Sequence, residues 1–128
     1  MIPMKSSYET WQSLPQMFFD KAEAQGDKPF LWVKRDGKYE SQSWQACASA
    51  ARALANGLRA LGIHPGDRVA IVSESRPEWL IADIAIMAAG AVTVPAYVTN
   101  TPADHRHILT NSGAKAVIVS TARLAAQV

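Results

Sequence analysis

Residues 62–95 constrain the fold more than any other stretch, because turn residues separate three apolar runs within them. The first run, residues 69–72, is rich in β-branched side chains and predicts a strand buried on both faces. Residues 79–88 are apolar on nearly every helical face, which predicts a buried crossover helix. Residues 91–94 predict a second strand. A strand, a helix and a strand in this order predict one βαβ unit with a right-handed crossover.

Turn and cap residues mark the ends of these elements. Residues 65–67, Pro-Gly-Asp, predict the turn before the first strand, since proline presets φ and glycine allows φ above zero. Ser75 is the expected N-cap of the helix, and Glu78 stands three residues later, where it can bond back. Pro77 suits the first helical turn, and Gly90 ends the helix.

The N-terminal half of the chain predicts a helix followed by a hairpin. Ser13 begins a capping-box pattern, and Gly26 ends the helix that it opens. The Asp-Gly pair at residues 36–37 stands between two strand-like runs, residues 30–33 and 38–41. Such a pair between strands is the strongest short-range signal of a β-hairpin.

A long helix is expected over residues 44–61, with Ser43 as its N-cap and Gly62 after its last turn. Apolar residues recur at intervals of three and four along one stripe. The stripe consists of Cys47, Ala51, Leu54, Leu58 and Leu61. Because the helix is rich in alanine, we expect it to pack closely on a sheet.

The C-terminal part continues the alternation of helices and strands. Thr101 is an expected N-cap, and residues 108–109 are the expected core of the helix that it opens. Residues 116–119 predict a third buried strand, and Ser120 or Thr121 begins a last helix. The fold class is therefore α/β: an incomplete doubly wound parallel sheet (β-α-β-α-β-α), preceded by a helix, a β-hairpin and a long helix.

Length and charge exclude several classes of protein. A chain of 128 residues suffices for one domain with a core, and a net charge of +2 does not favour a nucleic-acid partner. A single cysteine can form no intrachain disulfide, which favours a reduced, cytoplasmic setting. Peripheral contact of the protein with the inner face of the membrane is left open. We expect no secretory signal in residues 1–10, and no transmembrane segment, since Gly90 and Pro95 interrupt the uncharged residues 84–103.

The side chains that could carry chemistry each have a simpler structural interpretation. His105 and His107 are two positions apart, so on a helix they face different sides and cannot readily share a metal ion. We expect both to be solvated. Cys47 lies on a core stripe and has no evident partner for a nucleophile. His64 lies in a turn. The sequence thus offers no catalytic residue and no metal ligand, and none of the common phosphate-binding or hydrolase motifs is present.

One general rule still points to a place for a ligand. Open α/β sheets bind ligands at the carboxyl ends of their strands, which here are residues 73–75, 96–100 and 120–123. The backbone N–H groups near Ser75, together with Arg76, could face an anion at the helix start. The alternative is that the same residues serve only to form the loops and to cap the helices.

Several short motifs, taken together in order and spacing, resemble the N-terminal part of the adenylate-forming superfamily, the AMP-binding acyl-CoA synthetases and their relatives. The matching residues are 36–37, 43–44, 66–71, 77–79, 90–92, 95, 108–109 and 112–115. Residues 95–102 look most like the long-chain fatty acyl branch. The resemblance extends from about Leu14 to Ala126.

The resemblance implies a function. Such enzymes use Mg-ATP to convert a fatty acid into an acyl-adenylate, release pyrophosphate and transfer the acyl group to CoA. Some relatives use the loop matching Tyr97, Val98 and Thr99 at the CoA entrance. Their phosphate loop and catalytic lysines come later in the chain. We therefore expect residues 1–128 to be an N-terminal subdomain, truncated before the phosphate loop and inactive alone, with no cofactor of its own.

Two other interpretations remain. The chain could be a free-standing α/β binding or interaction module, or part of a different adenylate-forming enzyme, such as an aryl-CoA ligase or a peptide-synthetase adenylation domain. A subdomain should expose surface that the rest of its enzyme covers, so we expect this chain to self-associate. If the chain stays monomeric and binds little of a hydrophobic dye, the free-standing module would be favoured.

Overall fold

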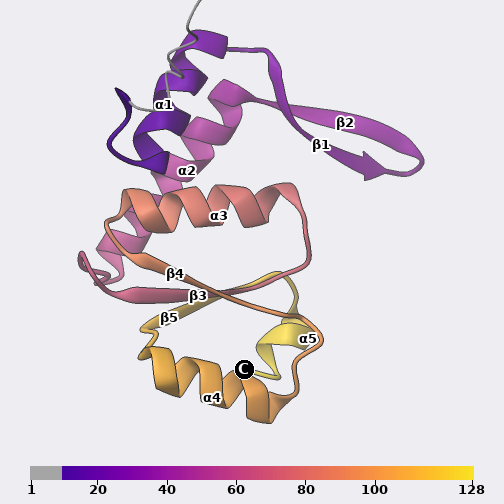
Figure 1. The fold of residues 1–128 in the computed structure, drawn as a ribbon. Coiled ribbons are helices and arrows are strands. Elements are labelled where there is room, and N and C mark those ends of the chain that lie inside the picture. The colour runs from indigo at the N-terminus through magenta and orange to yellow at the C-terminus, as the bar shows by residue number, and fades with distance from the viewer. Residues whose placement is uncertain (1–9) are drawn as a thin grey trace, which may run out of the picture.

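The computed structural model describes residues 10–128, and residues 1–9, on which the expectation about a secretory signal largely rests, lie outside them. The elements are α1 (Leu14–Gln25), β1 (Pro29–Arg35), β2 (Lys38–Ser43), α2 (Trp44–Ala60), β3 (Arg68–Val72), α3 (Pro77–Ala88), β4 (Val92–Ala96), α4 (Pro102–Ser112), β5 (Ala116–Val119) and α5 (Ala122–Ala125). This order confirms the predicted one (Figure 1).

The central sheet has three parallel strands in the order β4-β3-β5. Ile71 of β3 pairs with Pro95 of β4 on one side and Ile118 of β5 on the other. α3 lies on one face of the sheet, whereas α4 and α5 lie on the opposite face (Figure 1). Helices therefore cover both faces of the sheet, which confirms the α/β fold class. Because the strands are parallel, the carboxyl ends of all three lie at one edge of the sheet.

β3 forms the middle of the core. Its residues 69–72 are fully buried, as the sequence predicts, and Ile71 shares an apolar cluster with Leu58 of α2 and Ile86 of α3. Each such side chain contributes roughly 1.5–3 kcal/mol on burial. Residues 116–119 are only partly buried, contrary to the prediction, because β5 is an edge strand with a neighbour on one side.

α2 packs chiefly against helices α3 and α1, so the expectation that it packs on a sheet is wrong: α3 occupies that face of the sheet (Figure 1). Ser43 caps it as predicted, accepting a bond from the Ala46 N–H at 3.0 Å. Cys47, Ala51 and Leu58 are buried on the predicted stripe, and Leu54 packs beside them. Leu61 is 83% exposed instead, because α2 ends at Ala60.

α3 begins one residue later than predicted. Its N-cap is Arg76, whose side chain makes no capping bond, so the assignment of Ser75 as cap is wrong. Pro77 is the first helical residue, as expected for the first turn. Glu78 does not bond back to Ser75 because its carboxylate pairs with the Arg76 side chain.

Thr101 caps α4, as predicted, and the structure adds a full capping box, with Thr101 accepting from the Asp104 N–H and Asp104 accepting from the Thr101 N–H. Its inward face differs from the prediction. His105 is only 1% exposed, so the expectation that it is solvated is wrong, although His107 is exposed. Residues 108–109 follow His105 by three and four positions, so they lie on the same face of the helix, where they are partly buried.

β1 and β2 form a separate antiparallel hairpin that projects from the helices (Figure 1). Asp36 and Gly37 have φ values of 50° and 77°, so both occupy the left-handed region that a two-residue hairpin turn requires. This confirms the predicted turn. Across residues 10–128, no helix combines the length and apolar character that a membrane crossing requires.

Candidate functional site

The carboxyl edge of the sheet has the topology of a ligand site. β3 leads into α3 on one face, and its neighbours β4 and β5 lead into α4 and α5 on the other (Figure 1). Where adjacent parallel strands send their chains to opposite faces, the diverging loops leave a crevice. The crevice here has two parts, one on each side of the end of β3.

The larger part lies between the ends of β3 and β4 and has a volume of about 420 Å³. It brings together two groups of residues that the sequence proposed separately, Ser75 on one side and Tyr97 with Val98 on the other. Thr99 does not line it. Tyr97 is 79% exposed, so its ring stands at the rim. The remaining lining residues are Ser73, Glu74, Trp79, Pro95 and Ala96.

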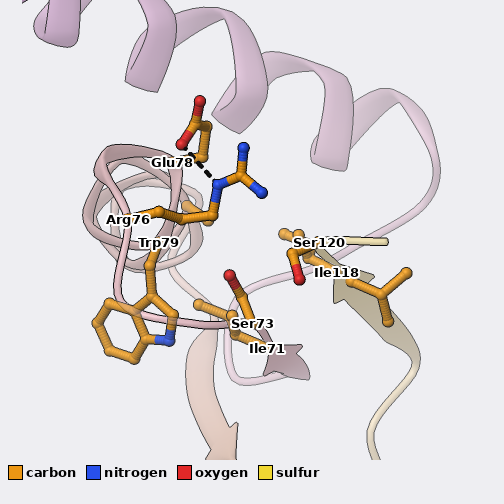
Figure 2. A pocket seen from close by; sticks show the side chains of 9 residues that line it. Ile71, Ser73, Arg76, Glu78, Trp79, Ile118 and Ser120 are labelled. Carbon is orange, nitrogen blue, oxygen red and sulfur yellow. Dashed lines mark hydrogen bonds and ion pairs between the residues drawn. The ribbon is translucent and has the colours of Figure 1, made fainter. Parts of the chain in front are cut away.

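The smaller part lies between the ends of β3 and β5 and has a volume of about 170 Å³ (Figure 2). Arg76 lines this part, so the sequence-proposed pair Ser75 and Arg76 is divided between the two cavities. Ser73 and Trp79 line both cavities and form the wall between them. The remaining lining residues are the apolar Ile71, Ala82, Ile118 and Val119, together with the polar Glu78 and Ser120.

Arg76 is engaged within the protein. Its Nε donates to Oε2 of Glu78 at 2.9 Å, the bond drawn in Figure 2, and Nη2 of Arg35 lies 4.0 Å from Oε1 of the same carboxylate. The Arg76 guanidinium lowers the pKa of Glu78, and Glu78 raises the pKa of Arg76. Because Glu78 offsets much of the Arg76 charge, an anion would compete with this carboxylate.

Glu74 lies within residues 73–75, one of the strand ends that the sequence singled out, but its bond to Ser120 was not predicted. The Ser120 hydroxyl donates to Oε2 of Glu74 at 2.6 Å, which lowers the pKa of Glu74 and ties the end of β3 to the end of β5. The only sequence signal was that Ser120 directly follows β5 and Glu74 stands two positions after the end of β3. Their pairing requires knowing that β3 and β5 are neighbours.

The other candidates have structural roles. Cys47 is buried, and burial raises the pKa of its thiol, which disfavours the nucleophilic thiolate. The backbone N–H of His64 donates to Asp67 at 2.7 Å and lowers the pKa of that carboxyl, at the opposite edge of the sheet. No group of three His, Cys, Asp or Glu side chains within residues 10–128 could hold a metal ion.

Residues 18–128 match the family model described as AMP-binding enzyme. The chain is 43% identical over 86 residues to the long-chain-fatty-acid–CoA ligase FadD15 of Mycobacterium tuberculosis, a match that covers 67% of this chain and 14% of that protein. It is 33% identical over 107 residues to the human mitochondrial acyl-coenzyme A synthetase ACSM5, covering 80% of this chain and 18% of that protein.

Solved structures of other enzymes also match the fold of this chain. A fatty acyl-adenylate ligase from L. pneumophila, in complex with acyl adenylate and pyrophosphate, superposes with a TM-score of 0.84 at 25% identity, covering 96% of this chain and 22% of that one. A benzoate CoA ligase from Burkholderia xenovorans has a TM-score of 0.79 at 32% identity, covering 89% and 22%. The N-terminal subdomain of Klebsiella oxytoca NpsA has a TM-score of 0.78 at 26% identity, covering 87% and 27%.

These matches span 67–96% of this chain but only 14–27% of each relative's length. The fold agrees with the N-terminal subdomains of adenylate-forming enzymes, the family model covers residues 18–128, and acyl-CoA ligases are among the relatives. The chain belongs to the family of AMP-binding enzymes.

Proposed function

We propose that residues 1–128 are the N-terminal subdomain of a longer AMP-forming fatty acid–CoA ligase. That enzyme converts a fatty acid, ATP and CoA into acyl-CoA, AMP and pyrophosphate, in the cytoplasm. The observation that carries the proposal is the 43% identity to a long-chain-fatty-acid–CoA ligase over 86 residues, within a family match over residues 18–128.

The crevice between β3 and β4 is the part of this chain that fits a substrate. Trp79, Pro95 and Val98 offer an apolar wall, and Ser73 and Ser75 stand beside it. This combination suits the thiol-bearing arm of CoA, a narrow chain of methylene and amide groups. In the proposal, these residues hold and orient that arm and exclude water from it.

The loop after β4 and the start of α3 complete the proposed assignment. Tyr97 at the rim and Val98 inside the crevice line the approach of CoA, with Thr99 following them outside it. Ser75 and Arg76 are proposed to face an anionic group of the substrate, with Arg76 exchanging its bond to Glu78 for one to that group.

The residues of this chain do not fit the ATP and magnesium site. Within residues 10–128, no cluster of His, Cys, Asp and Glu side chains could hold a metal ion, and the sequence has no Gly-rich phosphate loop. We therefore assign no step of adenylation to this chain and propose that it is inactive alone, with no bound cofactor.

The test is ATP–pyrophosphate exchange with palmitate as the acid, measured on the 128-residue chain and on the product of the complete reading frame. We expect exchange only from the complete product. We also expect the complete product to form palmitoyl-CoA when CoA is present. Exchange by the 128-residue chain would overturn its assignment as inactive. A complete product of 128 residues by intact mass would favour the free-standing binding module.

An aryl-CoA ligase is the second candidate, since the chain is 32% identical to a benzoate CoA ligase. The same exchange assay with benzoate in place of palmitate separates the two. Exchange with benzoate and none with palmitate would indicate that the acid substrate is aromatic. The proposed reaction would otherwise be unchanged.

A further inference from the structure

The small cavity between the ends of β3 and β5 combines one charged end with an apolar wall. The Arg76 guanidinium lines it together with the side chains of Ser73 and Ser120 (Figure 2). The apolar wall is made by core residues of β3, α3 and β5, namely Ile71, Ala82 and Ile118. Ligand sites typically join such an apolar lining to a few polar groups. The cavity therefore suits a small molecule with one polar end and one apolar end.

The hydrogen-bond donors that remain free at the charged end belong to Arg76. The Ser73 hydroxyl donates to the Glu74 carbonyl at 2.9 Å, and the Ser120 hydroxyl donates to the Glu74 carboxylate, so both hydroxyl protons are already used. Within residues 10–128, Arg76 donates through Nε to Glu78, and its two Nη groups have no partner. A pair of Nη groups matches the two oxygens of a carboxylate.

Glu78 already places a carboxylate on Arg76, at 2.9 Å from Nε (Figure 2). The Arg76 side chain is 39% exposed and the Glu78 side chain 51% exposed. Ion pairs this exposed change an equilibrium by at most about fivefold. A carboxylate from outside the protein would therefore replace one weak ion pair by another of the same kind.

Glu78 has other positive groups nearby when it leaves Arg76. Nη2 of Arg35 lies 4.0 Å from Oε1 of Glu78. Glu78 also stands in the first turn of α3, where the helix dipole favours a negative charge. Because Arg35 is the last residue of β1, a shift of Glu78 toward it would link the cavity to the hairpin.

We propose that the small cavity binds the carboxylate of a short organic acid at Arg76, and that this carboxylate displaces Glu78 toward Arg35. The proposal rests on the proposed function in one respect, that Arg76 faces an anionic group, and it names that group as a carboxylate. The cavity volume of about 170 Å³ is close to the roughly 150 Å³ that holds a benzene molecule. An acid of the size of butyrate therefore fits.

The charges favour a carboxylate over a phosphate. Two arginines and one glutamate, Arg35, Arg76 and Glu78, together carry a net charge of +1. One carboxylate balances that charge, whereas a phosphate group carries up to about two negative charges at neutral pH. Access follows from the proposed function, since Ser73 and Trp79 also line the crevice that is proposed to take a substrate.

The test is a titration of the 128-residue chain with butyrate at constant ionic strength, followed by the NMR signals of the arginine Nε–H groups. Butyrate should shift the signals of Arg76 and Arg35, and inorganic phosphate should bind more weakly. Arg76→Gln should weaken butyrate binding roughly tenfold or more, since it removes the charge-assisted bonds. Glu78→Gln should strengthen it about two- to fivefold, because the competing carboxylate is gone.

A double-mutant cycle tests whether Arg35 acts through Glu78. Arg35→Gln should weaken butyrate binding about twofold in the parent chain, because Glu78 loses its alternative partner. In the Glu78→Gln background the same substitution should have no effect. Lys34→Gln is the matched control: Lys34 is the neighbouring cation on β1 and lies over the Tyr39 ring, so this variant should bind butyrate like the parent chain. Circular dichroism checks that every variant is folded.

Several results would overturn the proposal. They are no butyrate-dependent shift at Arg76, binding in Glu78→Gln that is no stronger than in the parent chain, and phosphate binding as strong as that of butyrate. An equal effect of Arg35→Gln in both backgrounds would show that Arg35 is only a nearby charge and would overturn the displacement of Glu78. Each result is a binding measurement on the 128-residue chain, so its failure is distinguishable from a failure of the exchange assay that tests the proposed function.

Discussion

Glu74 and Ser120 lie 46 positions apart, yet their side chains meet at 2.6 Å. The bond favours the charged form of Glu74 and lowers its folded-state pKa. A group whose pKa is lower in the folded state stabilises the fold at a pH above its unfolded pKa, about 4.3 for glutamate. That stabilisation is lost as the pH falls through the folded-state value.

We predict that Glu74→Gln reduces the loss of stability on acidification. Glutamine keeps the shape of the side chain but does not titrate, so its contribution to folding no longer depends on pH. Urea unfolding at neutral and at acidic pH measures the effect. Glu40→Gln, on the exposed hairpin, is the control. An unchanged pH dependence in Glu74→Gln would show that the Ser120 bond is energetically unimportant.

A glycine at the end of α4 gives a second prediction at this scale. Gly113 has φ of 65°, and a Cβ there would lie 2.7 Å from Nη2 of Arg68, whose Nε bonds the Ser112 carbonyl at 2.6 Å. Gly113→Ala should lower the free energy of unfolding by about 1 kcal/mol, since alanine disfavours positive φ. Urea unfolding measures the change.

Gly57 is the matched control for this substitution. It lies inside α2, its φ is not positive, and a Cβ there would meet open space. Gly57→Ala should therefore raise the free energy of unfolding by about 0.5–1 kcal/mol. Changes of the same sign in both variants would contradict the argument from φ.

At the scale of elements, α2 packs against α3 and α1, with small residues at the contact. Ala51 is fully buried there, and Ala53 is exposed on the same helix. We predict that Ala51→Leu lowers the free energy of unfolding by about 1–3 kcal/mol, because the added atoms force the helices apart. Thermal or urea unfolding tests this.

Ala53→Leu places the same side chain on the solvent side of α2. Both residues favour helix, so this variant should unfold within about 0.5 kcal/mol of the parent chain. If Ala51→Leu were equally harmless, the contact between α2 and its neighbouring helices would be looser than its burial indicates.

At the scale of the whole molecule, the sheet has open sides. β5 is an edge strand, and within residues 10–128 its outer backbone groups meet no further strand. Its side chains, Ala116 to Val119, are only partly buried. An apolar strand with a free edge is a template for association with another chain.

We therefore predict that the 128-residue chain self-associates as its concentration rises. Sedimentation velocity over a range of concentrations should show a dimer or larger species, and a hydrophobic dye should bind to the exposed apolar surface. A concentration-independent monomer with little dye binding would contradict this prediction and favour the free-standing module.

Features that depend on neighbours in the chain were predictable from the residue types alone. The Asp36–Gly37 turn, the caps Ser43 and Thr101, and the buried strand β3 are all as predicted. Caps and tight turns are made by backbone and side-chain groups within about four residues, so residue types and their spacing suffice. The order of elements follows from the same signals.

Features that depend on which elements become neighbours could not be predicted in this way, because they arise only when the elements pack together. His105 is buried because α4 turns that face inward, and Leu61 is exposed because α2 ends just before it. Arg76 replaces Ser75 as N-cap of α3, since its side chain pairs with Glu78 instead of leaving that carboxylate to a capping box.

The candidate site divides in the same way. The rule about strand ends led to residues that line a crevice, but the crevice that joins Ser75 to Val98 exists only because β4 lies beside β3. The bond between Glu74 and Ser120 likewise exists because β5 lies on the other side. Local patterns specify the elements, and the order of the strands decides which of their ends meet.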